Sequence, residues 1–214
     1  MAKRSSSRPK ASKATSRSAD PATHVIDVAL GLAAEKGWRD LALGDIAAAA
    51  GLSLAGLYAL YPSKAAILGA YSRSVDEAML AEAATAEGDG PPESAKDRLF
   101  DLLMRRFDKL DAHKAGLLRI AEDNSRDPLS LACSLARLNR SMAATLEAAG
   151  ISAEGLGGRV RVKGLSAVYL TGLRAWFRDD SEDKAKTMAA LDRALSRAER
   201  LASGLGRHRK RAAA

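Results

Sequence analysis

Apolar residues recur at intervals of three and four positions along most of the chain, the spacing of one face of an α-helix. Runs of Gly, Pro, Asp or Ser interrupt this pattern, and no run of alternating β-branched residues predicts a strand. The sequence therefore predicts an all-α fold. Helices are expected near residues 21–36, 44–50, 54–60, 63–85, from 93 or 94 onward, 116–123, 127–149, 159–178 and 181–205.

Residues that stabilise helix ends mark several of these boundaries. Asp20 and Asp127 each precede a proline, a pattern typical of a cap before the first helical position. Gly37 is expected to end the first helix, and Ser181 to cap the last one. The glycines within residues 155–158 predict a loop.

Residues 43–61 have the spacing of a helix-turn-helix motif. With Leu43 at the first place, Ala47 falls at the fifth, where the two helices cross closely. Gly51 falls at the ninth, where the turn favours a left-handed residue, and Ser53 can cap the second helix. An ordinary helical hairpin packed through alanines is the alternative interpretation. The apolar places that hold the two helices at an open angle are Ile46, Ala50, Leu52, Leu57 and Leu60.

Together with its flanks, this motif resembles the DNA-binding domain of TetR-family transcriptional regulators over residues 22–70. The resemblance implies a three-helix DNA-binding domain at residues 20–70. It also implies a helical effector-binding and dimerisation domain at residues 71–205. The residues that carry it are Ala29, Glu35, Lys36, Gly37, Asp45, Ile46, Ala47, Ala50, Gly51, Leu57, Tyr58, Tyr61, Pro62, Ser63 and Lys64.

The resemblance also implies which residues contact double-stranded DNA with a palindromic operator. Phosphate contacts are expected from Tyr58, Tyr61 and Lys64, and contacts with bases from the start of the second motif helix. The full set is Leu43, Gly44, Ser53, Leu54, Ala55, Tyr58, Tyr61 and Lys64.

The sequence departs from the family pattern at three places. Leu43 stands where a capping Thr or Ser is usual, and Ala33 stands where a large aromatic is usual. The expected recognition helix carries no charge, and Ala55 can offer a base only a methyl contact, for instance with thymine.

The basic charge of the chain is concentrated at its two ends. Residues 1–19 hold six Lys and Arg and no acid, and residues 207–214 hold four. Without these ten, 24 basic residues face all 26 acids, so the body of the chain is slightly acidic. The segment at residues 1–19 is expected to be a disordered arm, and residues 206–214 a basic tail. Both are either solvated tails or electrostatic arms for an anionic polymer or surface. The arm residues expected to contact DNA are Arg4, Arg8, Lys10, Lys13 and Arg17.

The helix that restarts at residue 93 or 94 has two apolar faces, which suggests burial between neighbouring helices. One stripe contains Leu99, Leu102, Leu103, Arg106 and Leu110. The simpler interpretation is that these apolar residues pack in the core. The alternative is a cavity for a small apolar effector or lipid, lined by Leu103, Met104, Phe107 and His113.

The last two helices are expected to pair with a second copy of the chain, because TetR-like proteins commonly dimerise through them. Burial within one chain is the alternative. The expected interface residues are Leu165, Tyr169, Leu173, Trp176, Leu191 and Leu195.

Other chemistry finds little support in the sequence. No catalytic motif or metal-ligand spacing is present, so no enzyme activity, cofactor or metal is expected. The single cysteine, Cys133, is interpreted as a buried small residue more readily than as a reactive thiol. No apolar run is long enough to cross a membrane, and a cytoplasmic location is expected.

Two functions of different classes remain open. The first is a homodimeric repressor that a small apolar effector releases from its operator. The second is an accessory protein of ubiquinone biosynthesis, a class that has a TetR-like fold and binds isoprenoid lipids. Residues 98–118 and 176–195 look similar to the lipid-binding domain of such proteins. The intact motif spacing favours the regulator.

Overall fold

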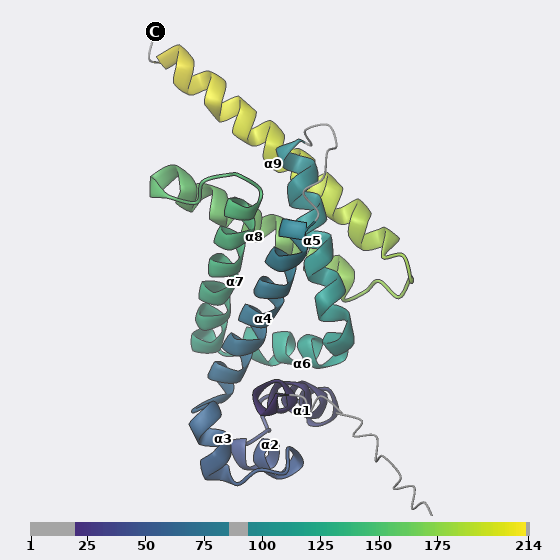
Figure 1. Cartoon of the computed structure of the whole chain (residues 1–214). Coiled ribbons are helices and arrows are strands. Elements are labelled where there is room, and N and C mark those ends of the chain that lie inside the picture. Colours follow the sequence, from purple (N-terminus) through teal and green to yellow (C-terminus); the bar gives the residue numbers. More distant parts are fainter. Residues whose placement is uncertain (1–19, 86–93, 213–214) are drawn as a thin grey trace, which may run out of the picture.

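The computed structural model describes residues 20–85 and 94–212, and the side chains as far as residue 203. Every regular element in these residues is helical, which confirms the predicted all-α fold (Figure 1). The elements are α1 (Pro21–Lys36), α2 (Leu43–Ala49), α3 (Leu54–Leu60), α4 (Lys64–Thr85), α5 (Ala95–Leu110), a short 3-10 helix η1 (Asp111–His113), α6 (Lys114–Ser125), α7 (Pro128–Ala148), α8 (Gly155–Trp176) and α9 (Ala185–Ala212).

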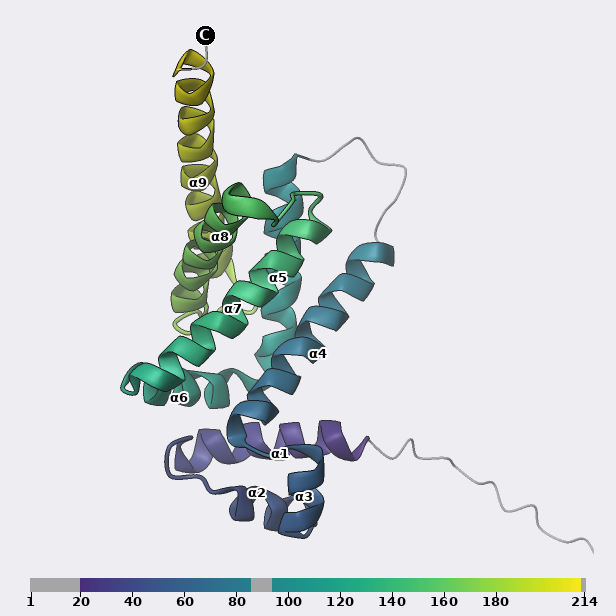
Figure 2. The same ribbon diagram turned by 90° about the vertical axis from the view of Figure 1, so that its left-hand side faces the viewer.

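Helices α1, α2 and α3 form a small unit at one end of the molecule, and α4 leads from it into the larger helical body (Figures 1 and 2). The chain bends by 103° between α2 and α3, within the range of helix-turn-helix motifs. Gly51 has a φ of 68° in the turn, a backbone conformation that residues other than Gly adopt only at an energetic cost. Ile46 and Leu57 are fully buried in the core of this unit. The predicted helix-turn-helix is therefore present.

Most of the expected helix caps are also present. The Ser53 hydroxyl accepts a hydrogen bond from the Gly56 N–H at 3.0 Å, and Asp20 and Asp127 accept from N–H groups of α1 and α7. At α2 the usual Thr or Ser cap is missing. Asp45 compensates in part by accepting the Ala42 N–H at 2.9 Å.

The core of the larger body is built from aromatic side chains of α5 and α8. The rings of Phe107 and Tyr169 stack with their centroids 5.2 Å apart, and Trp176 lies 5.8 Å from Phe107. Phe107 and Trp176 are almost completely buried. Helices α8 and α9 pack along each other, and α9 projects beyond the rest of the body (Figures 1 and 2).

Three boundary predictions were wrong. The glycines of residues 155–158 form the first turn of α8 instead of a loop, and Gly158 is buried there against Ala153. The last helix begins at Ala185 and not after Ser181, whose hydroxyl is hydrogen-bonded to Asp179. This helix also continues through residues 206–212, which the sequence assigned to a separate tail. The predicted arm at residues 1–19 lies outside the described residues.

Among the described residues, no single helix is both long and apolar enough to cross a membrane. The bent pair α2–α3 passes that criterion when its two helices are taken together.

Candidate nucleic-acid interface

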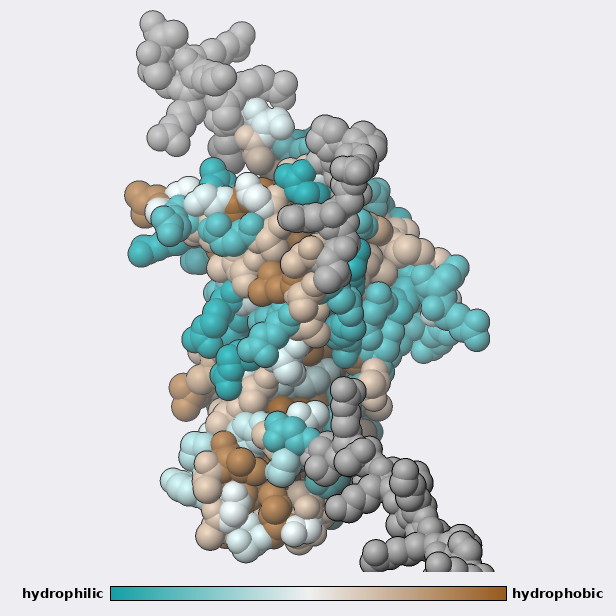
Figure 3. Space-filling view, viewed as in Figure 1, coloured by the Kyte–Doolittle hydropathy of each residue, from teal (hydrophilic) through white to brown (hydrophobic). Residues whose placement is uncertain are grey.

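The outward face of α3 is apolar and exposed. Leu54 retains 55% of its accessible surface and Tyr58 retains 60%, and Ser53 and Ala55 at the start of the helix are also exposed. Figure 3 shows apolar surface gathered at this end of the molecule, over the α2–α3 unit. Exposed large apolar side chains that cluster at one place commonly mark an interaction site. The predicted contact residues of α3 are thus free to meet a partner.

The start of α2 contributes less surface than expected. Gly44 is exposed, but Leu43 is half-buried and packs against the core of the domain. Its side chain is therefore partly committed to the fold.

Tyr61 differs from the prediction of a phosphate contact. Its side chain is 9% exposed, and its hydroxyl donates to the Ala22 carbonyl at 3.2 Å. Burial raises the pKa of Tyr61 from its ordinary value. The residue ties the end of α3 to the start of α1 and has little surface left for DNA.

Lys64 is also engaged within the chain, which argues against the predicted phosphate contact. Its ammonium donates to the carbonyls of Trp38 at 2.6 Å and Leu41 at 2.6 Å, and to the Arg39 carbonyl at 3.2 Å. An ammonium has three N–H donors, so all of them have partners here. The charge also lies 5.3 Å from the centre of the Trp38 ring. Lys64 holds the loop between α1 and α2 against the start of α4.

A second anchor fixes the same loop to the larger body. The Asp123 carboxylate at the end of α6 accepts the N–H groups of Trp38 and Arg39, both at 2.9 Å. The hydrogen bond from Arg39, together with that from Trp38, holds the pKa of the Asp123 carboxyl below its ordinary value. The orientation of the helix-turn-helix is thus linked to α6.

The predicted effector residues are all at least half-buried in the larger body. Leu103 and Phe107 are completely buried in the core, and Met104 is half-buried beside it. His113 is half-buried, with its Nε2 3.3 Å from Asp27 Oδ1 and its ring edge against Tyr71. The burial of Leu103 and Phe107 agrees with the core interpretation, and their contact with an effector stays a prediction.

A buried polar cluster lies close to these residues. Arg106 is 5% exposed and forms an ion pair with Asp76, and the Ser141 hydroxyl donates to Asp76 at 2.7 Å. The Nε of Arg106 and the hydroxyl of Tyr71 are buried without a hydrogen-bond partner in the described structure. The sequence contained one signal for this cluster, a basic residue within an otherwise apolar stripe of α5.

Most of the predicted dimer residues are buried inside the single chain. Leu191 is completely buried, and Leu173 is half-buried against the core. Because burial is complete without a partner, these side chains form the core between α8 and α9 and not an outer surface. The others with at most 5% exposure are Leu165, Tyr169, Trp176 and Leu195.

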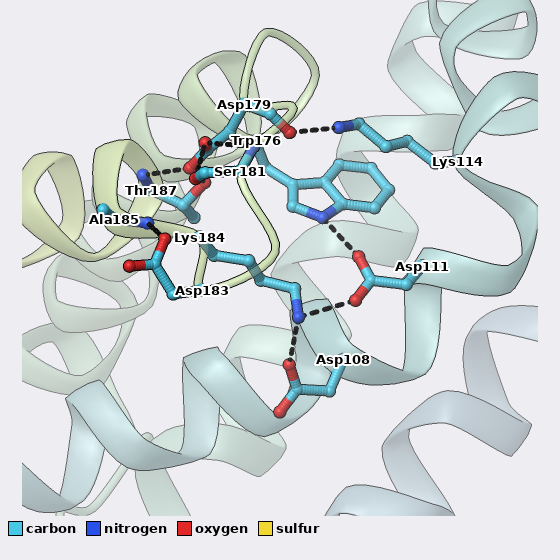
Figure 4. Close-up of polar contacts among 10 residues, drawn as sticks. All are labelled: Asp108, Asp111, Lys114, Trp176, Asp179, Ser181, Asp183, Lys184, Ala185 and Thr187. Carbon is cyan, nitrogen blue, oxygen red and sulfur yellow. Dashed lines mark hydrogen bonds and ion pairs between the residues drawn. The ribbon is translucent and has the colours of Figure 1, made fainter.

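The turn between α8 and α9 is held by a dense set of polar contacts (Figure 4). The Asp179 carboxylate accepts the N–H and the hydroxyl of Thr187, both at 2.7 Å, and so satisfies a free donor in the first turn of α9. Burial alone would raise the pKa of Asp179, but the hydrogen bonds from Ser181 and Thr187 outweigh it and hold the pKa well below its ordinary value.

Lys184 completes this turn. Its backbone has a φ of 53°, and its ammonium lies 2.8 Å from Asp108 and 2.7 Å from Asp111 (Figure 4). Asp111 also accepts the indole N–H of Trp176 at 2.8 Å. These contacts fix the start of α9 against α5. The described residues contain no group of three or more His, Cys, Asp or Glu side chains suited to a metal ion.

Comparison with known proteins identifies the domain that carries the exposed helix. Residues 25–71 match the family model described as bacterial regulatory proteins, tetR family. The chain carries the N-terminal domain of the tetR family. A search of curated proteins found no significant match.

Solved TetR structures resemble the whole described fold. The TetR transcriptional regulator from Nitrosomonas europaea is 27% identical, with a TM-score of 0.67, and the match covers 84% of this chain and 99% of that one. A TetR regulator from Rhodococcus sp. RHA1 is 18% identical, with a TM-score of 0.59 and coverage of 83% and 94%. Thermus thermophilus FadR, a TetR-family repressor solved with lauroyl-CoA, is 18% identical, with a TM-score of 0.51 and coverage of 84% and 92%.

Proposed function

We propose that this TetR-family transcriptional regulator is a homodimeric repressor that places α3 in the major groove of a palindromic operator. The observation that carries the proposal is the exposed face of α3, where Leu54 and Tyr58 point out of a helix-turn-helix. In this motif the second helix enters the major groove.

Recognition of bases relies on apolar and hydroxyl contacts, because α3 contains no charged residue. Leu54 and Ala55 offer methyl groups to thymine, and Ser53 offers a hydroxyl to either a donor or an acceptor on a base edge. Tyr58 supplies a hydroxyl to the phosphate backbone. Electrostatic attraction then comes mainly from residues 1–19, which hold six positive charges.

The two chains of the dimer meet through the exposed faces of α8 and α9. Leu156, Val160 and Leu201 retain 81%, 67% and 70% of their surface there, and Ala167 is exposed on the same helix as Val160. These residues replace the predicted set, whose side chains belong to the core. A palindromic operator requires two copies of α3 on one duplex, which a two-fold symmetric dimer supplies.

The effector is a small molecule, largely apolar, with one hydrogen-bond acceptor. The buried Nε of Arg106 and hydroxyl of Tyr71 support this chemistry, because a buried donor without a partner is costly and an acceptor on the effector would satisfy it. His113 lies beside Tyr71 and near Asp27 of α1, so an effector at this place also lies close to the DNA-binding domain.

The alternative, a lipid-binding accessory protein of ubiquinone biosynthesis, is not favoured. The structures named above are transcriptional regulators, and the helix-turn-helix has its usual bend and an exposed second helix.

Selection of bound duplexes from a random pool by the full chain tests the proposed function. Enrichment of a palindromic sequence over successive rounds supports it. Failure to enrich any sequence, with a protein that shows helical circular dichroism and a cooperative thermal transition, would overturn it.

A further inference from the structure

A cleft of about 480 Å³ lies between the DNA-binding domain and the first half of α7. We call it the interdomain cleft. Trp38, Leu41 and Leu43 line it from the loop before α2 and the first residue of α2. Leu129, Cys133 and Arg137 line it from α7, whose first turns lie nearest to the small domain (Figures 1 and 2). Its volume is within the range of cavities that bind small molecules.

The charges of the interdomain cleft have one sign. Its ionisable groups are Lys64, Arg137 and the thiol of Cys133, and none of the residues that line it carries a carboxylate. The Lys64 ammonium is occupied by backbone carbonyls, which leaves Arg137 as the cation available to an occupant.

Arg137 is half-buried and has unused hydrogen-bonding capacity. Its guanidinium donates through Nη2 to the Ser134 hydroxyl at 2.9 Å, and it forms no ion pair with a carboxylate of the described residues. A guanidinium has five N–H donors in a planar arrangement that suits two oxygens of an acid group. Burial lowers the pKa of Arg137 from its ordinary value, which is a sign that its charge is poorly solvated.

The remaining walls of the interdomain cleft favour a ligand with an apolar body. Trp38 and Leu41 are buried, whereas Leu129 keeps 74% of its surface exposed. An aromatic or branched aliphatic group would cover Leu129 and contact the wall formed by Trp38. Such a contact would remove apolar surface of Leu129 and of the ligand from water, which favours binding.

We propose that the interdomain cleft binds a small organic anion with an apolar body, whose acid group pairs with Arg137. The bound molecule would contact α7 and the start of α2 together. The site is separate from the polar cluster around Arg106 and does not depend on the proposed contact with DNA.

The single cysteine of the chain provides the measurement, because Cys133 is exposed and lines the cleft. The full chain is treated with neutral 2,2′-dithiodipyridine, and the rate of thiol modification is followed with increasing 2-naphthoate or neutral 2-naphthamide. Saturable protection by 2-naphthoate, at least about tenfold stronger than that by 2-naphthamide, is expected, since an ion pair with a poorly solvated partner contributes roughly 1.4 kcal/mol or more.

Variants of α7 test the role of the guanidinium. Arg137→Gln should abolish the preference for the anion, and Arg137→Lys should retain part of it. Arg140→Gln is the matched control, because Arg140 is exposed on the same helix and does not line the cleft. Equal protection by the two probes in the unmodified chain would overturn the proposal. Undiminished protection by 2-naphthoate in a folded Arg137→Gln variant would also overturn it.

Discussion

Replacement of Lys64 by Met should destabilise the DNA-binding domain without removing a phosphate contact. Two carbonyls, those of Trp38 and Leu41, accept from the ammonium at 2.6 Å in partly buried positions. The Arg39 carbonyl is exposed and can turn to water. A hydrogen bond to a charged group contributes about 1.5–3 kcal/mol, so two of them indicate a loss of about 3 kcal/mol, with Met retaining the packing of the aliphatic stem.

Urea denaturation and thermal circular dichroism measure this loss. For a chain of this size, 3 kcal/mol corresponds to a fall of about 6–12 °C in the midpoint. Lys36→Met is the matched control, because Lys36 is exposed in the same domain, and its change should be less than about 1 kcal/mol.

The salt dependence of DNA binding separates the two roles of Lys64. A lysine that neutralises one phosphate contributes about 0.9 to the slope of log affinity against log salt. The structural role predicts an unchanged slope in Lys64→Met at a temperature where the variant is folded. A slope reduced by about 1 per chain, together with unchanged stability, would refute the reasoning.

Four further predictions follow from the charges and packing. If three of the six positive charges of residues 1–19 neutralise phosphates, removal of this segment should lower the magnitude of the slope of log affinity against log salt by roughly 3 per chain. An equal slope in the shortened chain would mean that this segment does not contact DNA. Asp179→Asn should reduce stability at neutral pH. Because the folded pKa of Asp179 is depressed, its contribution to stability is present above the unfolded pKa of about 3.9 and is lost as pH falls below that value. The difference in unfolding free energy between wild type and Asp179→Asn should therefore shrink in acid. A difference that stays constant with pH in urea melts would contradict this. Arg106→Met should cost about 3–5 kcal/mol by leaving Asp76 unpaired, and Asp76→Leu in the same chain should restore much of that stability; additive losses would argue against the pair. Val160→Glu should dissociate the dimer in sedimentation without lowering the thermal midpoint, whereas a variant that stays dimeric would place the interface elsewhere.

The elements of the fold were predictable because they depend on local chemistry. Asp20 and Asp127 cap the helices that follow them, and Gly51 has the positive φ that its place in the motif suggested. The apolar spacing correctly indicated that Phe107 and Leu191 would be buried. Periodicity and capping were therefore sufficient to locate the helix-turn-helix and most helices, although the starts of α8 and α9 were placed wrongly.

The partners of the buried residues could not be predicted in the same way. Spacing cannot say whether Leu191 is buried by its own chain or by a second one. Lys64 and Tyr61 face carbonyls that are 23 or more positions away in sequence, so only the folded arrangement of α1 and the following loop reveals their role. Cys133 was expected to be buried and is exposed, because α7 begins above the interdomain cleft instead of inside the core. In the first turn of α9 the Thr187 N–H is accepted by Asp179, which lies eight positions earlier and so outside the usual capping distance.

The exposed face of α3 is the central element of the proposed function, and the affinity of the full chain for the duplex selected from a random pool tests it most directly. Leu54→Ala and Tyr58→Ala should each weaken binding by about tenfold or more, because each removes an exposed side chain from the helix proposed to enter the groove. Leu135→Ala is the matched control, since Leu135 is an exposed leucine on α7 and its loss should leave the affinity unchanged. Unchanged affinity in folded Leu54→Ala and Tyr58→Ala variants would contradict the account.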